Sequence, residues 1–159
     1  MTGIRNLICA AAVMVGALFV STGAFAQGVP LFAVMNGGNE CTVVAAGTVC
    51  RKGDLDAYGS ATIIFPTTTS LCFGIVVDNL AAPITAAHIH RGVSAVNGGI
   101  VVALTPPSAP AGGNPGASSG CVAGLSAALV SSIMANPSFY YVNVHDSAFP
   151  NGAIRGQLF

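Results

Sequence analysis

Charged residues are scarce in this chain, which has five basic and five acidic side chains among 159 residues. The formal net charge is zero at neutral pH. Proteins that bind nucleic acid or anionic lipid carry clustered basic side chains, and this chain has too few for such a cluster. We therefore expect neither nucleic acid nor a lipid surface as a partner. Surface solubility must come from Ser, Thr, Asn and Gly, a composition common in secreted and cell-surface proteins.

Motifs of several enzyme classes are also missing. The chain has no Gly-x-Ser-x-Gly segment of the kind that carries a hydrolase nucleophile. Its glycine pairs, Gly98-Gly99 and Gly112-Gly113, are not followed by the helix that a phosphate-binding loop requires. These absences disfavour hydrolases and nucleotide-binding enzymes, and we expect a protein without enzymatic activity.

One apolar run stands out, from Leu7 to Val20. It is shorter than the roughly 20 residues that span a bilayer, and a small-x-small segment for signal peptidase, residues 24–26, follows it. We predict that residues 1–26 are a signal peptide and that the mature protein begins at Gln27, with no membrane span. Residues 27–159 then form one exported domain, located in the periplasm or at the cell surface.

Four of the five cysteines follow the predicted signal peptide: Cys41, Cys50, Cys72 and Cys121. An even number of cysteines in an oxidising compartment indicates two disulfides, with three possible connectivities. We favour Cys41–Cys50, which closes a short loop, and Cys72–Cys121, which joins a strand to a long loop. A zinc site made of the four cysteines is disfavoured because no Cys-x-x-Cys spacing is present.

Apolar residues after Gln27 mostly follow the period-two pattern of half-buried strands. Gly, Pro and Asn end each run, and Ser126 is placed to cap one helix before Asn136-Pro137 stops it. We predict an all-β fold, an antiparallel Greek-key sandwich with one short helix. The expected strands are 31–35, 58–65 (ended by Pro66), 71–77, 86–91, 99–104, 139–145 and 153–158, the expected helix is 126–135, and 106–120 is expected to be a surface loop.

All three histidines fall within two of these strands. In the first, His88 and His90 share one face and Ile89 points to the other, because side chains alternate along a strand. In the second, Asn143 and His145 share the polar face. If the two strands are neighbours, three imidazoles converge on the solvent side of the sheet, where they could bind copper or zinc. The alternative is that the histidines only form the polar face of amphipathic strands. On the metal hypothesis, His90→Ala should weaken binding and leave the fold intact.

The histidine segments resemble signature blocks of the CHRD (chordin-repeat) family. The matching blocks are Ala87-His88-Ile89-His90-Arg91-Gly92, Gly99-Ile100-Val101, Tyr141-Val142-Asn143-Val144-His145 and Gly152-Ala153-Ile154-Arg155-Gly156-Gln157-Leu158. The resemblance covers the chain from Leu31 to its end. It implies an immunoglobulin-like or superoxide-dismutase-like β-sandwich in an extracellular setting, and it implies no established activity. Where the family commonly has an acidic residue, this chain has Ala153, so Arg155 lacks one expected partner.

Two further residues are candidates to support the histidines by orienting them, Asn143 and Arg155. Arg155 shares a face with Gln157, and it could instead form an ion pair with Asp146 or belong to a solvated face. A copper–zinc dismutase site needs more than three histidines, so a copper-dependent redox enzyme is a minor alternative. Our leading hypothesis is an extracytoplasmic binding or structural module with a copper or zinc site at the three histidines. The main alternative is a cell-surface matrix or filament subunit, which would associate with itself or with a surface protein and bind no metal.

Overall fold

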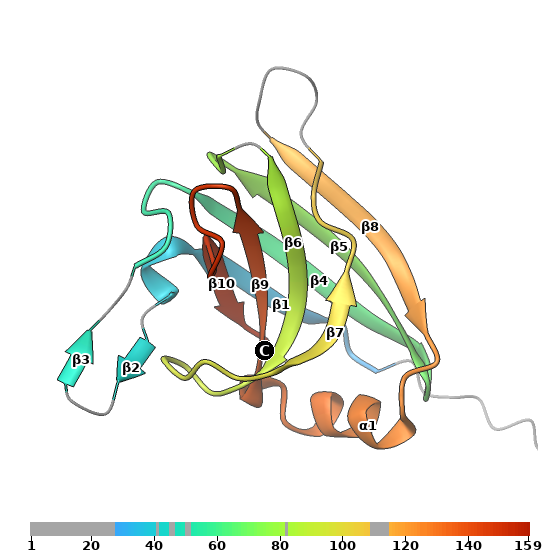
Figure 1. Cartoon of the computed structure of the whole chain (residues 1–159). Coiled ribbons are helices and arrows are strands. Elements are labelled where there is room, and N and C mark those ends of the chain that lie inside the picture. The colour runs from blue at the N-terminus through green and yellow to red at the C-terminus, as the bar shows by residue number, and fades with distance from the viewer. Residues whose placement is uncertain (1–27, 41, 45–46, 50–51, 82, 109–114) are drawn as a thin grey trace, which may run out of the picture.

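A computed structural model describes residues 28–40, 42–44, 47–49, 52–81, 83–108 and 115–159 (Figure 1). The predicted signal peptide and the predicted Cys41–Cys50 pair lie outside the described residues. The strands are β1 Leu31–Asn36, β2 Thr42–Val44, β3 Gly47–Val49, β4 Tyr58–Thr67, β5 Ser70–Asp78, β6 Ile84–Arg91, β7 Ile100–Leu104, β8 Gly116–Ala123, β9 Tyr140–Asp146 and β10 Ile154–Gln157. The helices are α1 Ala127–Ala135 and two short 3-10 turns, η1 Gly37–Asn39 and η2 Pro137–Phe139.

Eight of these strands form one antiparallel sheet in the order β7-β6-β9-β10-β1-β4-β5-β8. The sheet curls until its two edge strands approach each other, with β6, β7, β9 and β10 in front of β4, β5 and β8 in Figure 1. Ser108, which follows β7, exchanges two backbone hydrogen bonds of 3.0 and 3.2 Å with Ala117 of β8. Over the described ranges, the predicted all-β antiparallel fold with a single α-helix is confirmed. The two layers of the expected sandwich belong to one nearly closed sheet.

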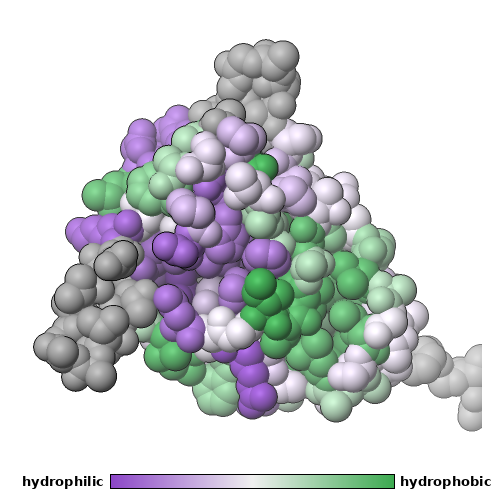
Figure 2. Space-filling model, viewed as in Figure 1, coloured by the Kyte–Doolittle hydropathy of each residue, from purple (hydrophilic) through white to green (hydrophobic). Residues whose placement is uncertain are grey.

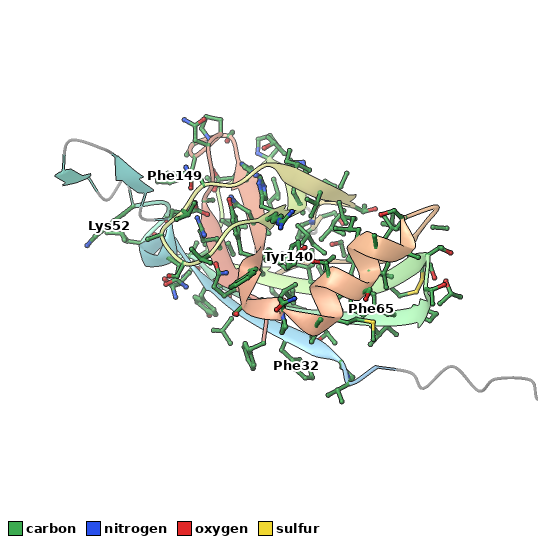
Figure 3. All side chains as sticks on the ribbon, turned by 90° about the horizontal axis from the view of Figure 1, so that it is seen from below. Phe32, Lys52, Phe65, Tyr140 and Phe149 are labelled. Atoms are coloured by element: carbon green, nitrogen blue, oxygen red, sulfur yellow. A yellow bond between two sulfur atoms is a disulfide. The ribbon has the colours of Figure 1, made fainter. Side chains whose placement is uncertain are left out.

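The hydrophobic core fills the space inside the curled sheet. Alternate residues of the strands point into it, as in β1, where Leu31, Ala33 and Met35 are buried and their neighbours are not. Helix α1 closes one end of the core with Val130 and Ile133. In Figure 3, Phe65 and Tyr140 lie beside this helix, whereas Phe32 projects from the outer side of β1. In the described part of the chain, no helix is long and apolar enough to cross a bilayer.

Helix α1 begins and ends where the sequence predicts. The hydroxyl of Ser126 accepts a 3.1 Å hydrogen bond from the backbone N–H of Leu129, which is the capping contact expected of this residue. Asn136 follows the last helical residue, and Pro137 opens η2. The helix is therefore specified by local signals at both ends.

Two expectations about strand ends are wrong. Residues 116–120, expected in a surface loop, begin strand β8, which pairs with β5 along its whole length. These residues are Gly, Ala and Ser, which have low strand propensity, so pairing with β5 rather than local preference orders them. Pro66 does not end β4, because the strand continues to Thr67 across a shift in register between Ile64 and Thr67. Such an irregularity accommodates a residue without an N–H.

A disulfide joins Cys72 of β5 to Cys121 of β8, which confirms one predicted pair. The two cysteines are direct cross-strand partners, and they are 49 residues apart in sequence. The bond therefore holds the edge strand β8, which has few large side chains of its own, against the rest of the sheet.

Replacing both Cys72 and Cys121 with serine is expected to lower the free energy of unfolding by about 2–4 kcal/mol, because the open chain regains loop entropy in the unfolded state. Neither side chain is buried, so the substitutions should leave no cavity. Urea unfolding of the oxidised wild type and the double variant measures the effect. The oxidised and reduced wild type should differ by a similar amount, and equal stability of all three would contradict this prediction.

Candidate metal centre

Pairing of β6 with β9 brings the three histidines together, as the sequence predicts. His88 lies opposite Asn143 across the two strands, and His145 lies opposite Ala86. The Nδ1 atom of His88 is 3.3 Å from the Nε2 atom of His145. One ligand atom from each of the three rings lies within 4.8 Å of the others. This cluster sits on the outer face of the sheet, where Figure 2 shows hydrophilic residues gathered over β6, β9 and β10.

In two of the imidazoles, a hydrogen bond to a backbone carbonyl determines which ring nitrogen carries the proton. Nδ1 of His90 is 3.0 Å from the carbonyl oxygen of Gly98, and Nδ1 of His145 is 3.1 Å from that of Pro150. A carbonyl only accepts, so each Nδ1 must donate and each Nε2 is unprotonated. The lone pair on Nε2 of His145 faces Nδ1 of His88 at 3.3 Å. Nε2 of His90 is buried, and no described residue offers it a hydrogen bond. A buried acceptor without a partner is costly, and a bound ion would satisfy it.

The donor set suits copper or zinc. Two nitrogens bound to one tetrahedral ion at about 2.0–2.1 Å are roughly 3.4 Å apart, close to the 3.3 Å between His88 and His145. Metal-binding histidines usually donate their second ring N–H to a carbonyl or carboxylate, as His90 and His145 do here. Three neutral imidazoles leave a fourth position open on such an ion. The three residues therefore fit a site of the kind that the sequence predicts.

Burial lowers the pKa of all three histidines below the ordinary value of 6.5. For His88, positive charge on His145 or His90 lowers the pKa further. For His90 and His145, hydrogen bonds to Gly98 and Pro150 act in the opposite direction. The rings are therefore neutral near pH 7, which leaves their lone pairs available to a metal ion.

The cluster is less open to solvent than the sequence suggests. His90 faces away from Ile89 and the core, as predicted, yet only 8% of its surface is exposed. His88 and His145 are partly buried. The loop of residues 92–98, which follows β6, covers His90 and supplies its carbonyl partner. Truncation of His90 therefore removes packing as well as a ligand atom, and the expectation that His90→Ala leaves the fold untouched does not follow from this geometry.

Tyr141 and Arg155 form a stack with His90 behind the cluster. The rings of His90 and Tyr141 are parallel within 5°, with centroids 4.8 Å apart, and the guanidinium carbon of Arg155 lies 3.5 Å from the centre of the Tyr141 ring. Strands β6 and β10 flank β9 on opposite sides, so His90 and Arg155 cover opposite faces of Tyr141. Period two places Tyr141 on the face of Asn143 and His145, a signal that sequence reasoning left unused.

Arg155 is almost fully buried, and its hydrogen-bond acceptors are in the covering loop, apart from the side-chain oxygen of Gln157 at 3.3 Å. It donates hydrogen bonds to the carbonyls of Val93 and Val96 at 3.3 and 3.2 Å and to the side-chain oxygen of Asn97 at 3.2 Å. The alternative partner, Asp146, instead accepts backbone N–H groups of residues 81, 148 and 149. Arg155 therefore holds the loop.

Asn143 lies between the histidines and Arg155 in the sheet. Its cross-strand neighbours are His88 on β6 and Arg155 on β10. The side chain is 3% exposed, and its oxygen is buried with no hydrogen-bond partner in the described part of the chain. Asn143 therefore shares the face and the neighbourhood of the cluster, as expected from sequence.

Glu40 is a buried carboxylate that sequence reasoning missed. Its side chain packs against Gly152, where an added Cβ would overlap the carboxylate, and the backbone there has a φ of +134° that favours glycine. Burial raises the pKa of Glu40 to about 7, although the positive charge of Arg155 lowers it. Glu40 thus lies close enough to interact electrostatically with Arg155, in a chain that has Ala153 where the family commonly has an acid. No local sequence pattern links residue 40 to residue 155.

Glu40→Gln is expected to change how stability depends on pH. The folded-state pKa lies above the ordinary value of 4.5, so the folded protein binds this proton more tightly than the unfolded chain does. The stabilisation that the folded protein gains from this bound proton is complete below pH 4.5, and it is lost as the pH rises through about 7. Between pH 5 and pH 8, the wild type should therefore lose up to about 3 kcal/mol relative to the glutamine variant. Urea unfolding at both pH values measures this difference, and the titration of other groups cancels between the two proteins. An unchanged difference would contradict the prediction.

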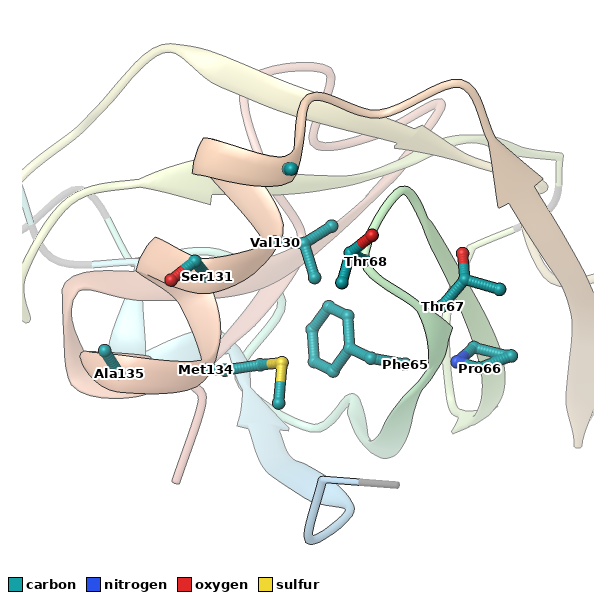
Figure 4. A pocket seen from close by; sticks show the side chains of 9 residues that line it. Phe65, Pro66, Thr67, Thr68, Val130, Ser131, Met134 and Ala135 are labelled. Carbon is teal, nitrogen blue, oxygen red and sulfur yellow. The ribbon is translucent and has the colours of Figure 1, made fainter. Parts of the chain in front are cut away.

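An apolar pocket lies away from the histidines, between α1 and the β4–β5 turn (Figure 4). Its volume is about 530 Å³, and Phe65, Val130 and Met134 line it. The remaining lining residues that the structure describes are Pro66, Thr67, Thr68, Ala127, Ser131 and Ala135. None of these side chains titrates near neutral pH.

Fold and cluster together define a class: an antiparallel β domain of one curled sheet, with three imidazoles gathered on its outer face. Residues 31–158 match the model of the CHRD domain, nearly the whole chain. The chain therefore belongs to the CHRD domain family, which confirms the resemblance. No curated protein and no solved structure gives a significant match.

Proposed function

We propose that this CHRD domain is an exported, non-enzymatic module that binds one copper or zinc ion through His88, His90 and His145. The observation that carries the proposal is the buried Nε2 of His90, which has no partner among the residues that the structure describes. The other nitrogen of this ring is engaged by Gly98. A ring held in this way keeps a lone pair on Nε2, in a residue that has a ligand atom within 4.8 Å of those of His88 and His145. The expected role is capture or display of the ion outside the cytoplasm.

Metal content of the purified protein tests this proposal. The protein is incubated with copper or zinc at pH 8, desalted, and analysed by mass spectrometry for bound metal. One ion per chain is expected in the wild type, and none in a variant with all three histidines replaced by alanine. Absence of binding by the wild type at micromolar metal would reject the proposal.

Binding rather than catalysis is proposed because the ligand set is small. A dismutase of the copper–zinc kind uses more histidines than the three that the whole chain contains. The groups packed around the cluster, Tyr141, Asn143 and Arg155, are held by the sheet and the covering loop rather than directed at an open substrate cleft. A superoxide assay of the copper-loaded protein, with free copper as reference, tests this part of the proposal.

Export is supported by the disulfide Cys72–Cys121, a bond that persists mainly in oxidising compartments. On this proposal the exported protein begins at Gln27, after the segment predicted to be a signal peptide. N-terminal sequencing of the protein from the cell exterior or periplasm checks the cleavage site, and an intact Met1 would contradict it.

A surface-assembly role is the second candidate, and one observation favours it. Apolar side chains are exposed on the outer face of the sheet around β1, among them Phe32, Val34, Val76 and Phe159. Phe32 and Phe159 lie beside each other, with ring centroids 6.3 Å apart. Sedimentation over a range of concentrations, with and without metal, would show whether the domain associates with itself.

A further inference from the structure

We infer that Arg155 is a positioning residue for the metal centre, which acts through the loop of residues 92–98 to make His90 a ligand. The guanidinium holds the loop, the loop places the carbonyl of Gly98 against Nδ1 of His90, and this contact leaves Nε2 free. The expected effect of Arg155 on metal affinity rests on the proposed function. Its expected effect on which nitrogen of His90 carries the proton does not depend on that function.

Side chains of the last strand hold the start and the middle of the loop. Arg155 donates to the carbonyls of Val93 and Val96, and Gln157 donates at 3.0 Å to the carbonyl of Gly92. Both side chains come from β10, two strands away from β6, where the loop begins. The Arg-Gly-Gln segment near the C-terminus therefore anchors both the start and the middle of a loop more than 50 residues earlier in the chain.

At its far end the loop has little freedom. The backbone N–H of Gly98 donates to the hydroxyl of Tyr141 at 3.2 Å, and an added Cβ at Gly98 would overlap the carbonyl of Arg91. Only glycine fits this close approach. Contacts with the hydroxyl of Tyr141 and with the backbone of Arg91 thus orient the carbonyl of Gly98. Arg155 holds the middle of the same loop over the sheet.

The proton position in His90 follows from this arrangement. The partner of one ring nitrogen determines which nitrogen is protonated, and a carbonyl at Nδ1 requires Nδ1–H. If the loop moves away, Nδ1 loses its acceptor and nothing favours that tautomer. A ring protonated at Nε2 must lose or transfer this proton before Nε2 can bind an ion. The same reasoning applies to His145, except that its acceptor, the carbonyl of Pro150, belongs to another loop.

The test compares wild type with Arg155→Lys in the metal-free protein at pH 8. Lysine keeps the charge but lacks the planar group that stacks on Tyr141 and donates in several directions. Nitrogen–proton correlation spectra of the imidazoles report the tautomer of each ring. We expect wild-type His90 to be protonated at Nδ1 and the variant to shift toward Nε2–H, whereas His145 stays at Nδ1–H in both. Zinc affinity measured by calorimetry should fall about 10–100-fold in the variant.

A folded Arg155→Lys protein in which His90 keeps the Nδ1–H tautomer would overturn the inference. If that variant does not fold, Asn97→Ala carries the test, because it removes the side-chain acceptor of the guanidinium and leaves Arg155 on Tyr141. His90 should then shift in the same direction by a smaller amount, and an unchanged tautomer would again overturn the inference. A wild type that binds no zinc would reject the proposed function, while the tautomer of His90 still decides the role of Arg155.

Discussion

His88→Ala is expected to weaken zinc or copper binding by more than about 100-fold and to leave the fold intact. Loss of a residue that only orients a ligand costs about 10–100-fold, so loss of one of three ligands should cost more. His88 is the best ligand to remove because it is only partly buried and its ring contacts the other imidazoles. Isothermal titration calorimetry at pH 8 measures the affinity, and circular dichroism checks the fold.

The control for this experiment is Thr85→Ala, which shortens an exposed side chain on the same strand. It should bind metal with wild-type affinity and stoichiometry. If His88→Ala also binds like wild type, the histidines are structural, and the assembly role becomes the better account of the domain. If both variants lose binding, the loss comes from a disturbed strand β6 rather than from the missing imidazole. The metal hypothesis then loses its direct support.

Strand periodicity, together with one assumption about which strands are neighbours, predicts which residues form the cluster. Side chains alternate along a strand, so His88 and His90 lie on one face of β6, and Asn143 and His145 lie on one face of β9. The one assumption was that the two strands are neighbours, and the pairing of β6 with β9 confirms it. The same rule places Tyr141 beside this cluster, so the aromatic part of the site was also within reach of sequence reasoning.

Long-range contacts account for what the sequence could not show. The carbonyls of Gly98 and Pro150 that orient the rings belong to loops, whose backbone positions no residue pattern reveals. Glu40 approaches Arg155 only because the chain folds back across more than 100 residues. Strand β8 was missed for the same reason, since its small residues become a strand only through pairing with β5. Local signals sufficed for α1, where the cap and the stop are both in the sequence.

Ile89→Ala is expected to destabilise the protein by about 2–5 kcal/mol, a large part of the stability of a typical domain. Ile89 lies between two of the histidines, but its side chain points to the other face of β6 and is completely buried in the core. Truncation removes buried apolar surface and leaves a cavity that the rigid sheet cannot close. Urea unfolding monitored by circular dichroism measures the loss, and Ile89→Val should show a smaller loss of about 0.5–1.5 kcal/mol.

The matched control is Ile100→Ala, the same change at a residue of β7 that pairs with His90 but is 57% exposed. Its effect should stay within about 0.5 kcal/mol, because a surface truncation leaves no cavity. The folded Ile89→Ala protein should still bind zinc, since the change alters the core face of β6 and not the face that carries the imidazoles. Substitution at position 89 should therefore lower stability, and substitution at position 88 should weaken metal binding, because the two side chains lie on opposite faces of β6. An Ile89→Ala protein of wild-type stability would show that this face of β6 does not pack in the core, and the assignment of His88 and His90 to the outer face would fail with it.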